Sequence, residues 1–233
     1  MTDHFQHIYN NQADQYEQLI SREDYRHNLL PAIQAIRPLA GLTVVEMGAG
    51  TGRLTRLLAP LVKQISAFDA AQPMLDVAAV KLAELGLTNW SIQQAEHKSL
   101  PVADHSADLV LAGWTFGHLP GWYPDRWQAE LSLILAEIKR VLRPDGTIII
   151  IETMGTGFET PRPPAEHLAA YYAHLEQRHG FSATAIRTDY QFASLAEAEQ
   201  LARFFFGDGL AEQVLANDWL ILPECTGLWW QHL

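Results

Sequence analysis

Three glycines alternate in the stretch VVEMGAGTGRLT, at Gly48, Gly50 and Gly52. Glycine lacks a Cβ atom, so it permits positive φ and lets backbone N–H groups approach a ligand closely. Because these glycines directly follow an apolar β-branched run, we expect a tight strand-to-helix turn at the carboxyl end of a first strand. Open α/β sheets bind ligands at this edge. A bare turn without a ligand is the alternative.

The spacing of the glycines narrows the choice of ligand. A phosphate-binding loop requires G-x-x-x-x-G-K-[ST], but Arg53 and Leu54 follow Gly52, and the next lysine is Lys63. A dinucleotide-binding turn requires G-x-G-x-x-G, and Arg53 stands where its third glycine would be. The pattern therefore disfavours nucleoside triphosphates, and it leaves a nicotinamide-dependent oxidoreductase as an alternative.

Two acids follow the next two predicted strands. Asp69 lies after the second strand, 17 residues past Gly52, where a carboxylate can accept both ribose hydroxyls of an adenosine. Glu96 follows the third strand, where it can accept a hydrogen bond from an adenine amino group. The alternative for each is a solvated surface acid.

The elements that position these residues alternate along the chain, as in a parallel sheet flanked by helices. The run IIII at 148–151 shows no apolar–polar alternation, so it predicts a mid-sheet strand covered on both faces. We expect Pro144-Asp145-Gly146 to end the helix before it. The predicted strands are 43–47, 64–68, 90–94, 107–112 and 147–153, with strand-like segments at 181–192 and 219–230. The predicted helices are 52–62, 72–85, 124–142, 165–179 and 194–206, and 155–164 is a loop.

Composition limits the class of protein. With 233 residues, 48% of them apolar, we expect one α/β domain over 1–233. The net charge of −11 disfavours nucleic acid and anionic membranes as partners. The single Cys225 fits a reducing cytoplasm, and no Cys/His cluster has zinc-ligand spacing, so we expect no metal. The polar N-terminus and the short apolar runs predict a soluble protein.

Several segments together resemble the class I S-adenosylmethionine-dependent methyltransferases. They are VVEMGAGTGRLT, Asp69 after a strand, AEHKSLP, SADLVLAGWTFGHL and EIKRVLRPDGTIIII, in this order and at this spacing. The resemblance covers roughly residues 40–153. It implies a Rossmann-like, mostly parallel sheet of seven strands with helices on both faces and the last strand antiparallel. It also implies a helical lid over 1–40, a cofactor-binding core over 41–153, and a C-terminal part of the same sheet over 154–233.

The resemblance also implies a set of cofactor contacts. The glycine turn would lie under the methionine part of S-adenosyl-L-methionine, and Glu46 would orient this turn and reach toward the cofactor's amino group. Asp69 matches the ribose-binding acid. A glutamate buried only to satisfy the turn is the alternative for Glu46. The implied cofactor contacts are Tyr16, Glu46, Met47, Gly48, Ala49, Gly50, Gly52, Asp69, Ala70, Met74, Glu96, His97 and Trp114.

A sulfonium is already an activated methyl donor, so alignment and exclusion of water are the main requirements for transfer. Where the acceptor carries a proton, a histidine is the usual base near neutral pH. In AGWTFGHLPGWY, His118 is the candidate base or substrate contact, and the alternatives are helix capping or packing between aromatic rings. The missing [DN]-P-P-[FYW] sequence disfavours methylation of amides or nucleobase amines.

IYNNQADQYEQL resembles the N-terminal helix that many small-molecule members of the family fold over the cofactor. The resemblance places Tyr16 at the position that often touches the carboxylate end of the cofactor. Tyr9, His27, Tyr171 and Tyr172 are further candidates for the substrate side. We therefore expect a cytoplasmic methyltransferase that acts on a small molecule and releases S-adenosyl-L-homocysteine. The alternatives are an inactive cofactor-binding sensor or partner protein and the nicotinamide-dependent oxidoreductase.

Overall fold

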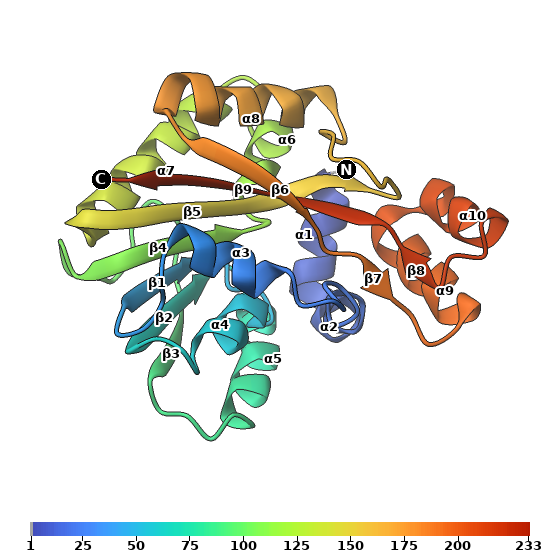
Figure 1. Cartoon of the computed structure of the whole chain (residues 1–233), viewed down its shortest axis with the longest axis horizontal. Helices are drawn as coiled ribbons and strands as arrows, with labels where there is room; N and C mark the ends of the chain where they lie inside the picture. The colour runs from blue at the N-terminus through green and yellow to red at the C-terminus, as the bar shows by residue number, and fades with distance from the viewer. Residues whose placement is uncertain (1) are drawn as a thin grey trace.

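A seven-stranded sheet forms the centre of the computed structural model, which describes residues 2–233 (Figure 1). Its strand order is β3-β2-β1-β4-β5-β9-β6. The first five strands along the chain pair in parallel, and β9 is antiparallel to both of its neighbours. The predicted fold class is confirmed. The strands are β1 (Thr43–Met47), β2 (Gln64–Asp69), β3 (Trp90–Gln94), β4 (Ala107–Gly113), β5 (Leu142–Thr156), β6 (Ser182–Arg187) and β9 (Glu224–His232).

The strand order reverses between β1 and β4, which creates the crevice where ligands bind in such sheets. From β1 the chain moves outward to β2 and β3, then returns to place β4 on the other side of β1. The turn after β1 and the turn after β4 therefore lie next to each other. This arrangement brings the glycine stretch and the segment around His118 to the same edge of the sheet.

Strand β5 lies between β4 and β9, as its uninterrupted isoleucine run predicts. Residues Ile148, Ile149, Ile150 and Ile151 are at most 1% exposed. Two of them face one core cluster and two face the other, because successive side chains of a strand point to opposite faces. The sheet therefore needs a helical layer on each side.

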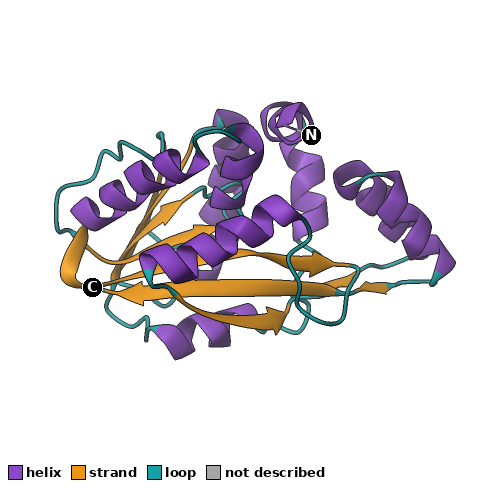
Figure 2. Ribbon diagram, turned by 90° about the horizontal axis from the view of Figure 1, so that it is seen from above, coloured by secondary structure: helices purple, strands orange, loops and turns teal. Residues whose placement is uncertain are grey.

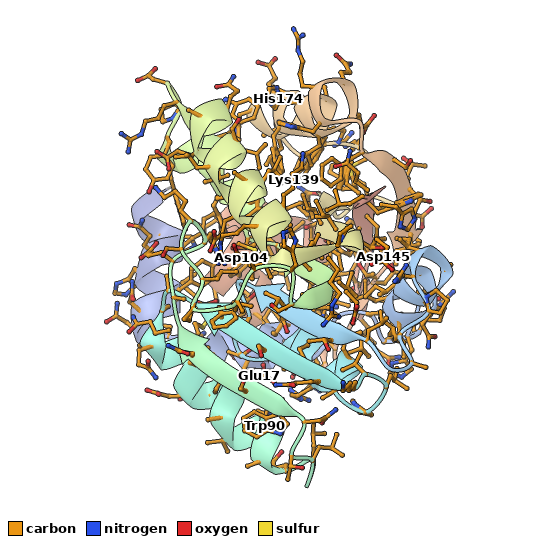
Figure 3. All side chains as sticks on the ribbon, turned by 90° about the vertical axis from the view of Figure 1, so that its left-hand side faces the viewer. Glu17, Trp90, Asp104, Lys139, Asp145 and His174 are labelled. Carbon is orange, nitrogen blue, oxygen red and sulfur yellow. The ribbon has the colours of Figure 1, made fainter. Side chains whose placement is uncertain are left out.

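Helices cover both faces of the sheet. On one face lie α7 (Trp127–Val141) and α8 (Glu166–His179), where the labels of Lys139 and His174 mark them in Figure 3. Before them come the 3-10 helix η1 (Phe116–His118) and α6 (Leu119–Trp122). On the opposite face lie α3 (Leu29–Ile36), α4 (Arg53–Leu58) and α5 (Gln72–Ala83).

A second layer of helices lies beyond the carboxyl ends of the parallel strands (Figures 1 and 2). Its first part consists of α1 (Thr2–Asn11) and α2 (Ala13–Ile20). Its second part consists of α9 (Leu195–Phe206) and α10 (Asp208–Ala216), together with a two-stranded antiparallel sheet of β7 (Tyr190–Gln191) and β8 (Ile221–Leu222). Leu19 of α2 packs into one apolar cluster with Leu201 and Ala202 of α9. The N-terminal helices are therefore attached to an insertion near the other end of the chain.

The structure differs from the predicted elements in several places. Strand β5 already begins at Leu142, so the prediction that Pro144-Asp145-Gly146 ends the preceding helix was wrong. Helix α7 ends at Val141, where Leu142 adopts an extended backbone, and the next residue, Arg143, is disfavoured from helical backbone because it precedes Pro144. The register between β4 and β5 shifts here, between Ala107 and Leu109. Helix α10, at 208–216, was not predicted, and α4 is shorter than the predicted 52–62.

Candidate functional site

The predicted tight turn joins β1 to α4. Gly48, Gly50 and Gly52 have φ of +74°, +54° and +81°, in the left-handed region that favours glycine. The amides of Gly48 and Ala49 both donate to the carbonyl oxygen of Phe68, at 2.8 and 2.9 Å. A Cβ on Gly48 would lie 2.5 Å from Thr115 Oγ1. The turn is thus held between β2 and the segment that follows β4, and a side chain at Gly48 would not fit.

A cavity of about 350 Å³ opens at this turn. Two acids, Asp69 and Glu96, line it, and within the described part of the chain its lining contains no lysine or arginine. The lining residues predicted from the sequence are Tyr16, Gly48, Gly50, Asp69, Ala70, Met74, Glu96, His97, Trp114 and His118. The lining residues not among the predicted contacts are Gln6, Tyr9, Asn10, Ala71, Gly113, Thr115, Trp122 and Tyr123, although Tyr9 was a substrate-side candidate.

Four predicted cofactor contacts lie behind this lining. Met47 and Ala49 are buried, and Gly52 packs with its Cα toward Ala78 of α5. Glu46 is also buried, and its Oε2 accepts a 2.6 Å hydrogen bond from Thr55 Oγ1 in α4. Burial raises the pKa of Glu46 to about 8, and the Thr55 hydrogen bond opposes that rise. In this structure Glu46 therefore joins β1 to α4 beneath the turn.

Asp69 connects the glycine turn to the start of α5. Its Oδ2 accepts from the amide of Gly50 and its Oδ1 accepts from the amide of Ala71, both at 2.8 Å. Burial raises the pKa of Asp69, and these backbone hydrogen bonds oppose the rise. Each carboxylate oxygen has a second lone pair, so both remain able to accept a hydrogen bond from a ligand hydroxyl. The carboxylate is thereby held in one orientation at the cavity wall.

His97 follows β3 at the side of the cavity. Its Nε2 lies 3.1 Å from Thr115 Oγ1, and its ring meets Phe116 edge-on, with centroids 5.4 Å apart. Burial lowers the pKa of His97 to about 4, so the ring is neutral at neutral pH. Glu96, next to it, is an exposed acid at the rim. The β3 and β4 ends are thus joined across the cavity through Thr115, a contact that sequence analysis missed.

His118 also lines the cavity and is bonded to the N-terminal helix. Tyr9 Oη lies 3.0 Å from His118 Nε2, and the imidazole stacks on Trp122 with centroids 4.8 Å apart and planes 8° apart. Of the alternatives, packing between aromatic rings is therefore observed, whereas the side chain makes no helix-capping hydrogen bond within the described chain. Burial lowers the pKa of His118 to about 4, and the nearby His97 adds to this. The imidazole is neutral at pH 7.

Glu152, which lies within β5, binds the backbone next to this histidine and was not predicted. Its Oε1 accepts from the amide of Gly117 at 2.8 Å, and the Tyr171 hydroxyl donates to the same oxygen at 3.5 Å. Burial raises the pKa of Glu152 to about 8. An acid directly after an isoleucine run was the available sequence signal. Tyr171 therefore lies behind the site, while the hydroxyl of Tyr172 donates to the Thr153 carbonyl.

The N-terminal helices are fixed to the turn by one acid, Glu17. Its Oε2 accepts from Thr51 Oγ1 at 2.6 Å, and its Oε1 pairs with Arg56 at 3.0 Å and Lys81 at 3.2 Å. Tyr9 and Tyr16 meet edge to face, with ring centroids 5.6 Å apart. His27 lies away from this cavity, in a second hollow that is lined by residues of the segment between α2 and α3 together with Arg53, Leu57 and Gln191.

Comparison with known proteins adds three findings. Residues 45–150 match the family model described as a methyltransferase domain. The chain is 28% identical over 154 residues to a demethylmenaquinone methyltransferase of Lactococcus lactis, covering 64% of this chain and 58% of that protein. It is 28% identical to the uncharacterised methyltransferase YcgJ of Bacillus subtilis, covering 47% of this chain and 40% of that protein. The chain spans about half the length of the curated relatives that it matches.

The fold is shared with solved structures of other proteins. A S-adenosylmethionine-dependent methyltransferase of Aquifex aeolicus superposes with a TM-score of 0.55 at 18% identity, covering 87% of this chain and 88% of that one. A phosphoethanolamine N-methyltransferase 2 of Haemonchus contortus, in complex with S-adenosyl-L-methionine, gives 0.60 at 16% identity, covering 96% and 59%. At these identities the likeness concerns the fold. Among residues 2–233 no group of three or more acids, histidines or cysteines is placed to hold a metal ion, and no helix there is long and apolar enough to cross a membrane.

Proposed function

We propose that this chain, which belongs to the class I S-adenosylmethionine-dependent methyltransferases, transfers the cofactor's methyl group to a small-molecule acceptor. The observation that carries the proposal is Asp69, because one carboxylate faces both the bare glycine turn and the cavity. A ribose needs an acceptor for its two hydroxyls at this place, and a phosphate would be repelled by it.

The residues present fit the cofactor. Gly48 lets the turn pack directly against Thr115, and Gly50 presents bare backbone beside Asp69, where a Cβ would meet no protein atom within 4 Å. Ala70 and Met74 supply apolar contacts for adenine, next to Glu96 and His97 at the rim. We assign the ribose to Asp69, the adenine to Ala70, Met74, Glu96 and His97, and the methionine end to Tyr16, Gly48, Gly50 and Trp114. We give Glu46, Met47, Ala49 and Gly52 the task of supporting the turn from behind.

S-Adenosyl-L-methionine, when bound, supplies an activated methyl on a positive sulfur. The chain's own residues must align an acceptor and accept its proton. The Tyr9 hydroxyl lines the cavity and is hydrogen-bonded to His118 Nε2. Tyr9 can therefore relay a proton: its oxygen takes the proton of the acceptor while its own hydroxyl proton moves to His118 Nε2. Since His118 is neutral at pH 7, it is able to accept one. Glu152 positions His118 through the amide of Gly117.

A small acceptor suits a cavity of about 350 Å³. Gln6, Tyr9 and Asn10 of helix α1 line the cavity, so this helix covers part of it. A small acceptor is sufficient to account for these lining residues. The relatives named for methylation of demethylmenaquinone also support a small acceptor. The net charge of −11 supports the absence of a nucleic-acid substrate. The charge and the single cysteine support a cytoplasmic location, which we retain as part of the proposal.

Thermal unfolding with two ligands tests the proposal. S-Adenosyl-L-homocysteine at 100 times its dissociation constant should stabilise the protein by about 2.7 kcal/mol, which is a shift of several degrees. NAD at the same concentration should give no shift, because the turn lacks the third glycine of a dinucleotide site. Stabilisation by NAD, with none by S-adenosyl-L-homocysteine, would reject the proposal.

A further inference from the structure

A row of aromatic rings connects helix α9 of the insertion to the Tyr9–His118 relay. Phe205 of α9 contacts two rings of this row: its centroid lies 5.2 Å from that of Phe5 in α1 and 5.5 Å from that of Tyr16 in α2. Centroid distances of about 4.5–7 Å are typical of attractive aromatic pairs. One residue of α9 therefore touches both N-terminal helices.

The two partners of Phe205 lead directly to Tyr9 and His118. The Phe5 centroid lies 6.4 Å from that of Tyr9 and 5.4 Å from that of His118. The Tyr16 ring meets Tyr9 edge-on, with centroids 5.6 Å apart. The hydrogen-bonded pair of Tyr9 and His118 is thus packed against the same two rings that Phe205 contacts.

Phe205 lies behind the cavity wall. Tyr9, Tyr16 and His118 line the cavity, whereas Phe205 is not among its described lining residues. A polar contact near the start of α1 adds to the ring contacts, because His4 Nε2 lies 3.2 Å from the carbonyl oxygen of Phe205. Phe205 is therefore placed to act on the relay through the N-terminal helices and not by touching a ligand.

The helix that carries Phe205 is itself held firmly. Helix α9 packs along α10, and its N-terminus is capped by the Ser194 hydroxyl, which accepts from the amide of Glu197. Phe205 also packs against the buried cluster that contains Leu201 of α9 and Leu19 of α2. Both α1 and α9 lie outside residues 45–150, the stretch that matches the methyltransferase family model. The contact between them is therefore not part of the matched domain.

The enclosure of His118 has an electrostatic consequence. Burial lowers the pKa of His118 to about 4, and the nearby His97 adds to this. The groups around it are neutral at pH 7, since burial raises the pKa of Tyr9 and lowers that of His97, while the buried Glu152 accepts from the Gly117 amide. If α1 moved away, water would reach the imidazole, and its pKa would return toward about 6.5. The titration of His118 therefore reports the position of α1.

We propose that Phe205 is a positioning residue for the Tyr9–His118 relay. By packing on Phe5 and Tyr16, its ring holds α1 against the cavity and so fixes the place of the Tyr9 hydroxyl. Loss of the ring loosens α1, breaks the contact of Tyr9 with His118 and admits water to the imidazole. The relay itself rests on the proposed function, whereas the effect of Phe205 on α1 does not.

Substitutions in α9 test the inference on the protein without ligand. Phe205→Ala removes the ring, and Phe205→Leu, which keeps more of the apolar volume, is the milder variant for use if the first does not fold. Phe204→Ala is the matched control, because Phe204 is also half-buried in α9 but its described ring contact is with Phe205, 6.4 Å away. Circular dichroism checks that each variant is folded. We would measure amide hydrogen exchange of residues 2–11 by mass spectrometry and the titration of His118 by NMR, with its signal assigned from His118→Gln.

Phe205→Ala should speed the exchange of α1 about 10-fold and move the pKa of His118 from about 4 toward 6.5, with smaller shifts in the same direction for Phe205→Leu. Phe204→Ala should change neither. Unchanged exchange of α1 in the Phe205 variants, or equal acceleration in the control, overturns the inference. Faster exchange with an unchanged titration of His118 also overturns it, because Phe205 would then only pack the helix.

Failure of the proposed function is seen separately. S-Adenosyl-L-homocysteine that does not bind the wild type in calorimetry would reject the proposed function. The exchange and the titration, which need no ligand, would still show whether Phe205 holds α1 and the Tyr9–His118 pair in place.

Discussion

Replacement of Gly48 by alanine should damage both the fold and the ligand site. At φ +74° a Cβ costs about 1–2 kcal/mol. The new atom would also lie 2.5 Å from Oγ1 and 2.6 Å from Cβ of Thr115, and because the second contact is close to the backbone, rotation of the side chain does not relieve it. Overpacking of this kind costs about 1–3 kcal/mol. Together the two effects predict that Gly48→Ala lowers the free energy of unfolding by about 2–5 kcal/mol.

Gly86→Ala is the matched control for this substitution. Gly86 has φ +64°, in the turn after α5, and a Cβ there would meet nothing within 4 Å. It should therefore show only the backbone cost of about 1–2 kcal/mol. Urea unfolding at pH 7 gives both values, and calorimetry with S-adenosyl-L-homocysteine should show weakened binding for Gly48→Ala alone. Equal losses of stability in the two variants would refute the close packing of the turn against Thr115.

Three further predictions concern the acids of the site. Asp69→Ala should weaken S-adenosyl-L-homocysteine by about 1.5–3 kcal/mol in calorimetry, the scale of hydrogen bonds to a charged group, and unchanged affinity would show that the ribose is elsewhere. Glu152, with a pKa raised by burial to about 8, stabilises the fold below pH 4.5 and loses that contribution as the pH rises toward 8. Glu152→Gln should remove this loss, on the order of 3–5 kcal/mol, so unfolding curves that fall equally with pH in both proteins would contradict it. Glu17→Ala removes the bonds to Thr51, Arg56 and Lys81, and should speed proteolysis of α1 and α2; unchanged cleavage rates would contradict its anchoring role.

Much of the sheet could be predicted because its signals are local. The isoleucine run of β5 and the glycines after β1 each report on their own surroundings, namely burial on both faces and positive φ. Asp69 was predicted at a strand end, and in a parallel sheet all strand ends meet at one edge. A residue that owes its position to a strand terminus is therefore placed correctly once the strand is found.

Pairs formed across the fold could not be predicted in the same way. The contact of Tyr9 with His118 joins residues 109 positions apart, and nothing in either neighbourhood specifies the other. Glu46 occupies its expected position on β1, but its partner is the Thr55 hydroxyl in α4. The orientation of a buried carboxylate depends on which hydrogen-bond donor the packing brings near it. That donor is known only once the whole structure is assembled.

The position of β9 has a consequence for the order in which the protein is completed. It is synthesised after β5 and β6, yet it pairs with both of them. Likewise the apolar side chain of Leu19 in α2 is covered only after Leu201 of α9 has been synthesised, because the two belong to one buried cluster. A nascent chain can therefore complete neither its sheet nor the packing of its N-terminal helices until α9 and β9 have been made, and during that interval its exposed edges invite association with chaperones or with other nascent chains.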